Sequence, residues 1–172
     1  IQLNAIDFDS RNIKSGYVFV AIKGSIVDGH KYIDLAINQG AVAVICETMP
    51  EKLVDGVTYV EVDNSNKALA IIASNFYENP SKNIRIGGVT GTNGKTTIAS
   101  LLYQLFKKAG YKVGLLSTVK IMVDEVEHKA THTTPDSLTI NHFLNEMIES
   151  GVDYCFMEVS SHGIHQKRTE GL

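Results

Sequence analysis

A glycine-rich stretch near the middle of the chain, GVTGTNGKTT at residues 88–97, has the residue types of a phosphate-binding loop. The common pattern is G-x-x-x-x-G-K-[ST], and counting back from Gly94 places Val89 where the first glycine belongs. The spacing therefore differs from the common loop by one residue. Gly91 and Gly94 still let successive backbone N–H groups face an anion, and Lys95 can reach the β- and γ-phosphates of a nucleotide.

The stretches on either side of the loop supply the setting that a phosphate site needs. The apolar run 84–89 predicts a strand that leads into the loop. Apolar residues then recur at i, i+3, i+4 and i+7 over 98–105, which predicts a helix that begins at the loop with its positive end toward the anion. Thr96 takes the position whose hydroxyl normally ligates Mg²⁺. The nucleotide-binding residues that we expect are Gly91, Thr92, Asn93, Gly94, Lys95, Thr96 and Thr97.

The loop alone leaves the reaction open. A GTPase would carry an N-K-x-D signature after a strand, whereas Asn66-Lys67 precedes the loop and is followed by Ala68-Leu69, which disfavours that class. A small-molecule kinase remains compatible with the loop.

Length and composition exclude some other classes. The chain has 172 residues, of which 44% are hydrophobic and 20% charged, a balance typical of one large or two small globular domains. The formal net charge is −3 without a long basic run, so we expect no nucleic-acid partner. No apolar run approaches the roughly 20 residues of a membrane span, and no signal-peptide pattern is present, so we expect a cytoplasmic protein. Cys46 and Cys155 lie in apolar runs and predict buried, reduced thiols.

The elements that must position the loop alternate between strand and helix. In the first half we expect strands at 17–22, 42–46 and 59–62 and helices at 30–39 and 69–76. The polar, proline-containing run 78–81 is the clearest boundary. In the second half we also expect strands at 113–116 and 154–159, a hairpin or extended arm over 119–130, and a helix that Thr134 caps, with Asp136 complementing its dipole.

This alternation predicts an α/β fold with mostly parallel sheets. We expect a small amino-terminal α/β domain at 1–83, followed at 84–172 by the first part of a mostly parallel ATPase domain of P-loop type. Only about three strands are evident after the glycine-rich loop, which is few for such a domain, so we expect the chain to be a piece of a longer protein.

Six stretches carry a resemblance to a known family. They are GTNGKTT (91–97), DSR (9–11), GYVFVA (16–21), DGH (28–30), TTP (133–135) and MEVSSHG (157–163). The first resembles the shortened ATP loop of the Mur ligases and their folate-polyglutamating relatives, and the next three resemble the UDP-binding domain of the peptidoglycan ligases. The last two resemble the MurE type, which adds the third amino acid to UDP-N-acetylmuramoyl-L-alanyl-D-glutamate. The resemblance covers essentially the whole chain.

The resemblance implies an ATP-dependent amide ligase. ATP would phosphorylate the D-glutamyl carboxylate, and the amine of meso-diaminopimelate or L-lysine would then attack the acyl phosphate. Glu158 resembles a family Mg²⁺ ligand, so we expect Lys95 and Glu158 to be catalytic and Thr96 and Glu158 to hold Mg²⁺. A third domain and a downstream lysine that helps hold a second Mg²⁺ would lie beyond Leu172. We therefore expect this chain alone to be inactive, and its parent to be monomeric.

The resemblance also implies that both halves hold the UDP-linked dipeptide. The expected contacts are Phe8, Ser10, Ser25, Ile26 and Val27 in the first half, and His132, Thr133, Thr134, Ser160, Gln166 and Arg168 in the second. Asp9 and Arg11 are either a structural turn pair or ligand contacts. No histidine spacing predicts a closed zinc site.

Two alternatives remain open. A MurF-type or other Mur ligase would differ in substrate, and a non-catalytic module that binds a nucleotide or a UDP-sugar would lack the reaction. The sequence past Leu172 would separate an enzyme from a binding module. A preference for the longer tripeptide precursor would favour the MurF type.

Overall fold

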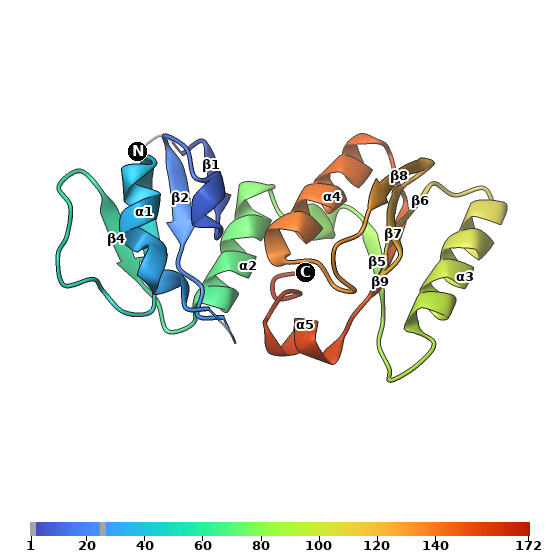
Figure 1. The fold of residues 1–172 in the computed structure, drawn as a ribbon. Coiled ribbons are helices and arrows are strands. Elements are labelled where there is room, and N and C mark those ends of the chain that lie inside the picture. The colour runs from blue at the N-terminus through green and yellow to red at the C-terminus, as the bar shows by residue number, and fades with distance from the viewer. Residues whose placement is uncertain (1–2, 25–26) are drawn as a thin grey trace. The chain divides into compact units, whose positions relative to one another are not determined.

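The computed structural model describes residues 3–24 and 27–172 of the chain. The chain forms two compact units, Ile1–Leu69 and Ala70–Leu172, and in each of them strands alternate with helices (Figure 1). This alternation confirms the predicted α/β fold class. The division between the units lies within helix α2 (Ser65–Phe76). The domain boundary that the sequence predicts between residues 83 and 84 stays a prediction.

The first unit contains a four-stranded sheet with the order β1-β2-β3-β4, in which every neighbouring pair is parallel. Its strands are β1 (Ala5–Asp7), β2 (Tyr17–Val20), β3 (Ala41–Cys46) and β4 (Thr58–Glu61). Its other helical segments are η1 (Ser10–Asn12), η2 (Gly29–Tyr32) and α1 (Ile33–Asn38). The three predicted strands are confirmed, whereas β1 was not predicted, because three residues are too few to show a period.

The helix predicted over 30–39 is divided in the structure. Asp28 accepts a hydrogen bond from the backbone N–H of His30, which caps the 3₁₀ turn η2, and α1 begins only at Ile33. The packing against the sheet comes from α1, through the buried residues Ile33 and Ala36. The apolar runs of β2 and β3 match a parallel sheet that is covered by other elements.

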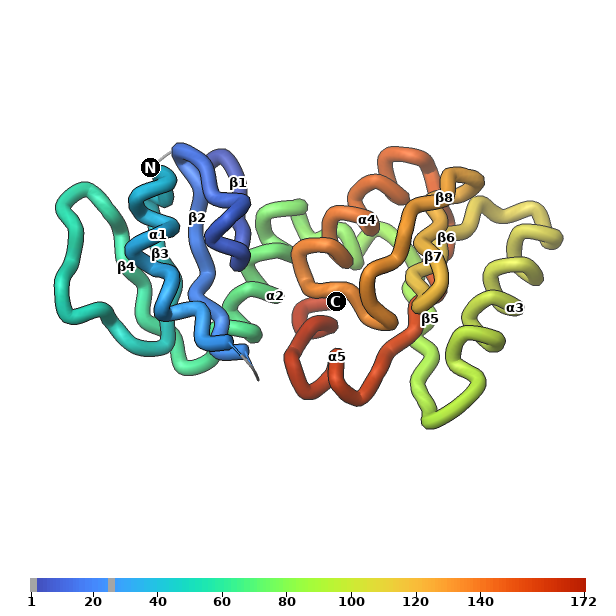
Figure 2. The backbone as a smooth tube through the Cα atoms, in the orientation of Figure 1, coloured from blue at the N-terminus to red at the C-terminus, as the bar shows by residue number. Residues whose placement is uncertain are grey.

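The second unit contains a five-stranded sheet with the order β5-β9-β6-β7-β8. The strands are β5 (Arg85–Val89), β6 (Val113–Leu116), β7 (Lys120–Val123), β8 (Val126–Lys129) and β9 (Tyr154–Glu158). The pairs β5–β9 and β9–β6 are parallel, and β7–β8 is the antiparallel hairpin that the sequence predicts over 119–130. The path of the chain through this sheet can be followed from green to red in Figure 2.

Helices cover both faces of the second sheet (Figure 1). The helical segments are η3 (Pro80–Lys82), α3 (Lys95–Lys108), α4 (Ser137–Glu149) and α5 (Ser161–His165). On one face, Ala99 and Tyr103 of α3 pack against Leu115 of β6. On the other face, Leu144 of α4 packs in the cluster that contains the next β6 residue, Leu116. Successive strand residues thus serve opposite cores.

The helix predicted from the apolar spacing over 98–105 is confirmed as part of α3, although Ile98, Leu101 and Leu105 are 49%, 58% and 61% exposed. One detail of the helix predicted after the TTP motif is wrong. Thr134 does not cap α4. Asp136 does so, by accepting a hydrogen bond from the backbone N–H of Thr139 at 2.9 Å, because an aspartate directly before the helix reaches the N–H groups of its first turn.

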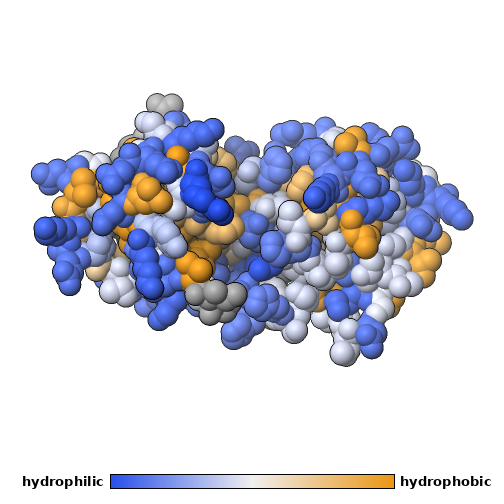
Figure 3. All heavy atoms as spheres, viewed as in Figure 1, coloured by the Kyte–Doolittle hydropathy of each residue, from blue (hydrophilic) through white to orange (hydrophobic). Residues whose placement is uncertain are grey.

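Both cysteines are buried free thiols, as the sequence predicts, and burial raises the pKa of Cys155 to about 12. On the face shown in Figure 3, apolar atoms lie in small groups among hydrophilic ones. Within residues 3–24 and 27–172, the helices are all too short or too polar to cross a membrane.

Candidate functional site

The glycine-rich loop lies between β5 and α3, in the order that a phosphate loop requires. Val89 is the last residue of β5, so the position that seemed to lack a glycine belongs to the strand. Gly91 and Gly94 have φ of +144° and +78°, values that glycine adopts without strain. Residues 91–94 are exposed at the N-terminus of the 14-residue helix α3. A tighter turn than the common loop therefore still presents its backbone at a positive helix end.

The ammonium group of Lys95 lies over this loop. Its Nζ donates a hydrogen bond to the backbone oxygen of Gly91 at 2.7 Å. An ammonium group has three N–H donors, so this bond leaves donors for a phosphate. Lys95 is therefore positioned at the anion-binding end of α3, where the sequence predicts it.

A buried carboxylate stands beside the loop because of the register of the sheet. Val89 and Glu158 are partners in the parallel β5–β9 ladder, so the last residue of β9 lies next to the point where the loop begins. Glu158 is 1% exposed, and its Oε2 accepts a hydrogen bond from the hydroxyl of Thr96 at 2.9 Å. The two residues predicted to hold Mg²⁺ are thus in contact.

This pair supplies oxygen ligands of the kind that Mg²⁺ prefers. The Thr96 hydroxyl gives its single proton to Glu158 and keeps its lone pairs for a cation. Among the described residues, no group of three or more His, Cys, Asp or Glu side chains is placed to hold a metal ion. One carboxylate and one hydroxyl, as Glu158 and Thr96 provide, fit Mg²⁺ at a nucleotide, where the ion keeps several waters and binds one or two carboxylates together with phosphate oxygens.

A further residue at this centre, Thr118, is not predicted by the sequence. It follows β6, and its backbone N–H donates to Glu158 Oε1 at 2.8 Å while its hydroxyl donates to Oε2 at 3.1 Å. The available signal was the polar pair Ser117-Thr118 directly after a buried parallel strand. Side chains at the carboxyl ends of neighbouring parallel strands meet at one edge of the sheet.

The TTP and MEVSSHG motifs meet at the same edge. The hydroxyl of Thr134, which is fully buried, donates to the backbone oxygen of Glu158 at 2.9 Å and accepts from the N–H of Ser160 at 2.9 Å. Ser160 in turn caps α5 by accepting from the N–H of Gly163 at 3.0 Å. A Cβ at Gly163 would lie 2.9 Å from the Thr134 side chain, so only glycine permits this approach. The two motifs therefore hold each other in place.

The remaining substrate residues predicted in the second unit lie around these motifs. Arg168 donates from Nε and Nη2 to Gln166 Oε1 at 3.0 and 2.7 Å, and from Nη1 to the backbone oxygen of Thr134. The hydroxyls of Thr133 and Thr118 are 3.1 Å apart, and His132 is exposed. The structure brings Thr133, Thr134, Ser160, Gln166 and Arg168 together, and their contact with substrate stays a prediction.

Of the five substrate residues predicted in the first unit, the structure describes three. Phe8 is half-buried, Ser10 is buried, and Val27 is 51% exposed. Ser25 and Ile26 lie outside the described residues. Contact of any of these five with a UDP group stays a prediction.

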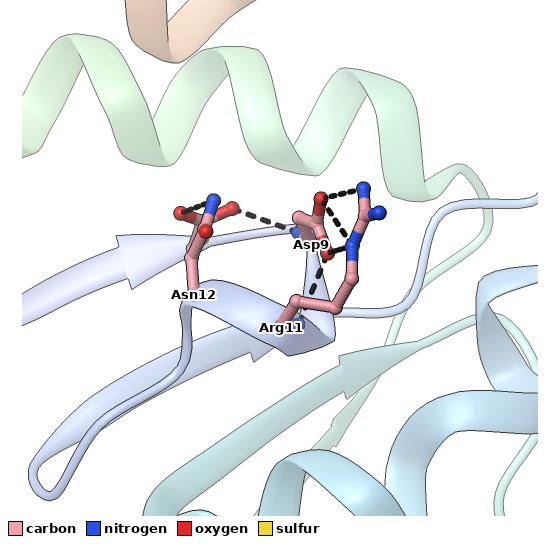
Figure 4. A network of polar contacts seen from close by, with 4 residues as sticks. Asp9, Arg11 and Asn12 are labelled. Atoms are coloured by element: carbon pink, nitrogen blue, oxygen red, sulfur yellow. Dashed lines mark hydrogen bonds and ion pairs between the residues drawn. The ribbon is translucent and has the colours of Figure 1, made fainter.

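The DSR motif forms a turn pair. Asp9 caps η1 by accepting from the N–H of Arg11, and Arg11 Nη2 forms an ion pair with Asp9 Oδ2 at 2.6 Å (Figure 4). The hydrogen bond from the Arg11 side chain lowers the pKa of Asp9 below its ordinary value. Of the two interpretations left open by the sequence, these contacts favour the structural one.

The DGH motif is also tied to its own unit. His30 Nδ1 lies 2.6 Å from Asp28 Oδ1, and His30 Nε2 accepts the backbone N–H of Glu47 at 2.8 Å. Because Nε2 is the acceptor, the ring proton is on Nδ1 and faces Asp28. The hydrogen bonds from the backbone and the side chain of His30 lower the pKa of Asp28.

The glycine-rich loop, the N-terminus of α3 and the buried carboxylate of Glu158 indicate that the second unit is a nucleotide-binding α/β domain. Comparison with protein families agrees with this. The Mur ligase middle domain matches residues 89–172, and the amino-terminal part, described as the Mur ligase family catalytic domain, matches residues 2–77. The chain belongs to the Mur ligase family.

Individual relatives are similar along the whole chain. The UDP-N-acetylmuramoyl-L-alanyl-D-glutamate–2,6-diaminopimelate ligase of Bacteroides fragilis is 50% identical over 172 residues, which cover 100% of this chain and 36% of that protein. The protein of the same name from Clostridium tetani is 43% identical over 174 residues, again 100% and 36%. The chain thus spans about a third of the length of these relatives.

Solved structures show the same likeness. A structure of a UDP-N-acetylmuramoyl-L-alanyl-D-glutamate–2,6-diaminopimelate ligase superposes with a TM-score of 0.79 and 26% identity, over 99% of this chain and 34% of that one. The MurF ligase of Thermotoga maritima in complex with ADP gives a TM-score of 0.60 and 28% identity, over 93% and 33%.

Proposed function

We propose that the whole protein is an ATP-dependent ligase that joins diaminopimelate to UDP-N-acetylmuramoyl-L-alanyl-D-glutamate. The observation that carries the proposal is the meeting of Lys95, Thr96 and Glu158 at one loop, in a chain 50% identical to a ligase of that name. The curated relatives described above are named for diaminopimelate, so we propose it over L-lysine. We further propose a cytoplasmic, monomeric enzyme without nucleic-acid or membrane partners.

In this proposal, the second unit prepares ATP for attack by the D-glutamyl carboxylate. The backbone of 91–97 binds the phosphates, and Lys95 places positive charge at the group to be transferred. Thr96 and Glu158 would hold Mg²⁺, which neutralises charge as the phosphoryl group moves. The group formed by Thr133, Thr134, Ser160, Gln166 and Arg168 would orient the muramoyl dipeptide, because it lies beside Glu158. Phe8, Ser10, Ser25, Ile26 and Val27 would hold the UDP end.

The test uses the whole protein with ATP, Mg²⁺, UDP-N-acetylmuramoyl-L-alanyl-D-glutamate and either diaminopimelate or L-lysine. Product mass and phosphate release are measured together. We expect one tripeptide product, formed with diaminopimelate, and one phosphate per amide bond. Product formed only with L-lysine would contradict the choice of amino acid, and a reaction that needs D-alanyl-D-alanine would favour the MurF type.

Two further samples sharpen this test. Lys95→Ala is expected to lower kcat by about 100-fold or more, because it removes a charge aimed at the transition state. The matched change Lys108→Ala, at an exposed position at the other end of α3, is expected to leave the rate unchanged. The 172-residue chain by itself is expected to give no product, and detection of amide-bond formation by it would contradict that expectation.

A further inference from the structure

The side-chain carboxylate of Glu158 accepts several hydrogen bonds in addition to the backbone bonds of the sheet. Three donors reach it: the hydroxyl of Thr96, and both the N–H and the hydroxyl of Thr118. A carboxylate offers about four lone-pair directions, two on each oxygen. Oε2 takes two of the donors and Oε1 takes one, so one lone pair remains, on Oε1. The donors therefore determine which lone pair a cation can meet.

Thr118 donates hydrogen bonds to both oxygens of the Glu158 carboxylate, whereas Thr96 donates to Oε2 alone. Its N–H binds Oε1 at 2.8 Å and its hydroxyl binds Oε2 at 3.1 Å. Two donors on two oxygens fix the rotation of the carboxylate about its last bond, as a bidentate contact does. A single donor on one oxygen leaves that rotation free.

The turn that carries Thr118 is itself fixed. Ser117 is fully buried, and its hydroxyl donates to the backbone oxygen of Lys120 at 2.7 Å and accepts the Lys120 N–H at 3.2 Å. The backbone N–H of Ser117 donates to the same oxygen at 3.1 Å. These bonds join the end of β6 to the start of β7. Thr118 is thus held at a defined position by the turn between the antiparallel strands β6 and β7, independently of the glycine-rich loop.

The direction of the second contact of Thr118 follows from its single proton. Its oxygen lies 3.1 Å from Glu158 Oε2 and 3.1 Å from the hydroxyl of Thr133. The carboxylate is the stronger acceptor because charge-assisted hydrogen bonds are the stronger ones. The Thr118 proton therefore faces Glu158, and Thr133 donates to Thr118. A chain of hydroxyls then runs from the TTP motif to the carboxylate.

We propose that Thr118 is a positioning residue that orients Glu158 for Mg²⁺ at the bound nucleotide. The proposal rests on the proposed function, in which Glu158 and Thr96 hold that ion. Thr118 acts through Glu158. Removal of its hydroxyl leaves Oε2 with one donor and a second free lone pair, so the donors no longer select the Oε1 lone pair for the cation. We expect this loss to weaken Mg²⁺ binding without removing a ligand or a phosphate contact.

The test measures metal binding directly, in the whole protein. ADP binding is followed by calorimetry at a series of Mg²⁺ concentrations, and Mn²⁺ binding to the ADP complex by electron paramagnetic resonance. Thr118→Val keeps the shape and the N–H but removes the hydroxyl. We expect it to raise the half-saturating Mg²⁺ concentration about 10-fold or more, the range for a lost hydrogen bond to a charged group. ADP binding without metal should be unchanged.

Three variants complete the design. Thr118→Ser restores a hydroxyl and is expected to bind Mg²⁺ within about 3-fold of the unchanged protein, because the same bond to a charged group can form. Thr58→Val makes the same chemical change at an exposed position of β4 and should have no effect. If Thr118→Val fails to fold, Thr118→Cys, a weak donor, is expected to lie between the serine variant and a hydroxyl-free site.

The outcomes separate this proposal from the one on which it rests. Mg²⁺ dependence of Thr118→Val equal to that of the unchanged protein would overturn the positioning role alone. So would a serine variant as impaired as the valine variant, or a cysteine variant that matches the unchanged protein. If ADP binding by the unchanged protein does not respond to Mg²⁺, that result would instead contradict the proposed function, and with it the positioning role of Thr118.

Discussion

The polar motifs of the two units use their side chains in different ways. In the first unit, the charged side chains of DSR and DGH pair within their own motifs: Arg11 with Asp9, and His30 with Asp28. The longer bond from the backbone N–H of Glu47 to His30 also stays within the unit. In the second unit, residues that are far apart in sequence converge on one carboxylate, with Thr96 and Thr118 bonded to Glu158 from two other elements. Motifs that are equally visible in the sequence thus have local structural roles in one unit and build a shared centre in the other.

The largest effect on the reaction rate is expected from a substitution at the shared centre around Glu158. Glu158→Gln keeps the shape but replaces one oxygen by an NH₂ group, which cannot accept the bonds from Thr96 or Thr118. We expect the rate of the proposed ligase reaction of the whole protein to fall by roughly 100-fold or more, since loss of even an outer partner of a metal ligand costs about 10–100-fold. Steady-state kinetics at saturating Mg²⁺ measures this. A rate within a few fold of the unchanged protein would exclude Glu158 from the site.

The next effect concerns the contact between TTP and MEVSSHG. Gly163→Ala places a methyl group 2.9 Å from the side chain of Thr134, which is fully buried and held by three hydrogen bonds. We expect a loss of about 1–3 kcal/mol in the free energy of unfolding, the usual range for overpacking. Urea denaturation of the chain checks this. Gly88→Ala, whose new methyl would lie 3.3 Å from Val159, is the milder comparison, and an equal loss in both would argue against a special approach at Gly163.

A smaller effect is expected in the first unit at low pH. The pKa of Asp28 is lowered by the hydrogen bonds from the backbone and side chain of His30, and that of Asp9 by the side chain of Arg11. A lowered pKa in the folded state means that the unfolded chain binds protons first, so the stability is present above the ordinary value of 3.8. It is lost as the pH falls through the lower, folded values.

Melting of the chain between about pH 5 and pH 2.5 checks this window, where paired carboxylates lose their charge. We expect Asp28→Asn to melt lower than the unchanged chain at pH 5 and to differ less from it at pH 2.5. A difference that grows as the pH falls would contradict the sign of the linkage.

The smallest effect is expected from Arg11→Ala. The side chain of Arg11 is 84% exposed, and exposed ion pairs contribute little because water and salt screen them. Asp9 keeps its bond to the backbone N–H of residue 11, so the cap of η1 remains. We expect a melting temperature unchanged within error. A clear loss of affinity of the whole protein for the UDP-linked dipeptide would instead show that Arg11 contacts ligand.

The same contrast explains what the sequence could and could not predict. The α/β class, the loop and Glu158 follow from runs of apolar residues and from motifs, which are local signals. Thr118 does not, because its importance arises only when β6 pairs beside β9 and brings Thr118 to Glu158. The buried side of α3 does not follow from its apolar spacing for a related reason, since the choice between Leu105 and Tyr103 as the buried residue depends on the sheet beneath.

A crystal structure of the whole protein with ADP and Mn²⁺ would show whether the loop, Thr96 and Glu158 form one metal–nucleotide site. We expect an anomalous Mn²⁺ peak within about 2.0–2.3 Å of Thr96 Oγ1, a hard-cation distance, with Glu158 bound to it directly or through one water. We also expect Thr118 to hold both oxygens of Glu158. A peak elsewhere, or a Glu158 side chain turned away from the metal, would contradict that arrangement.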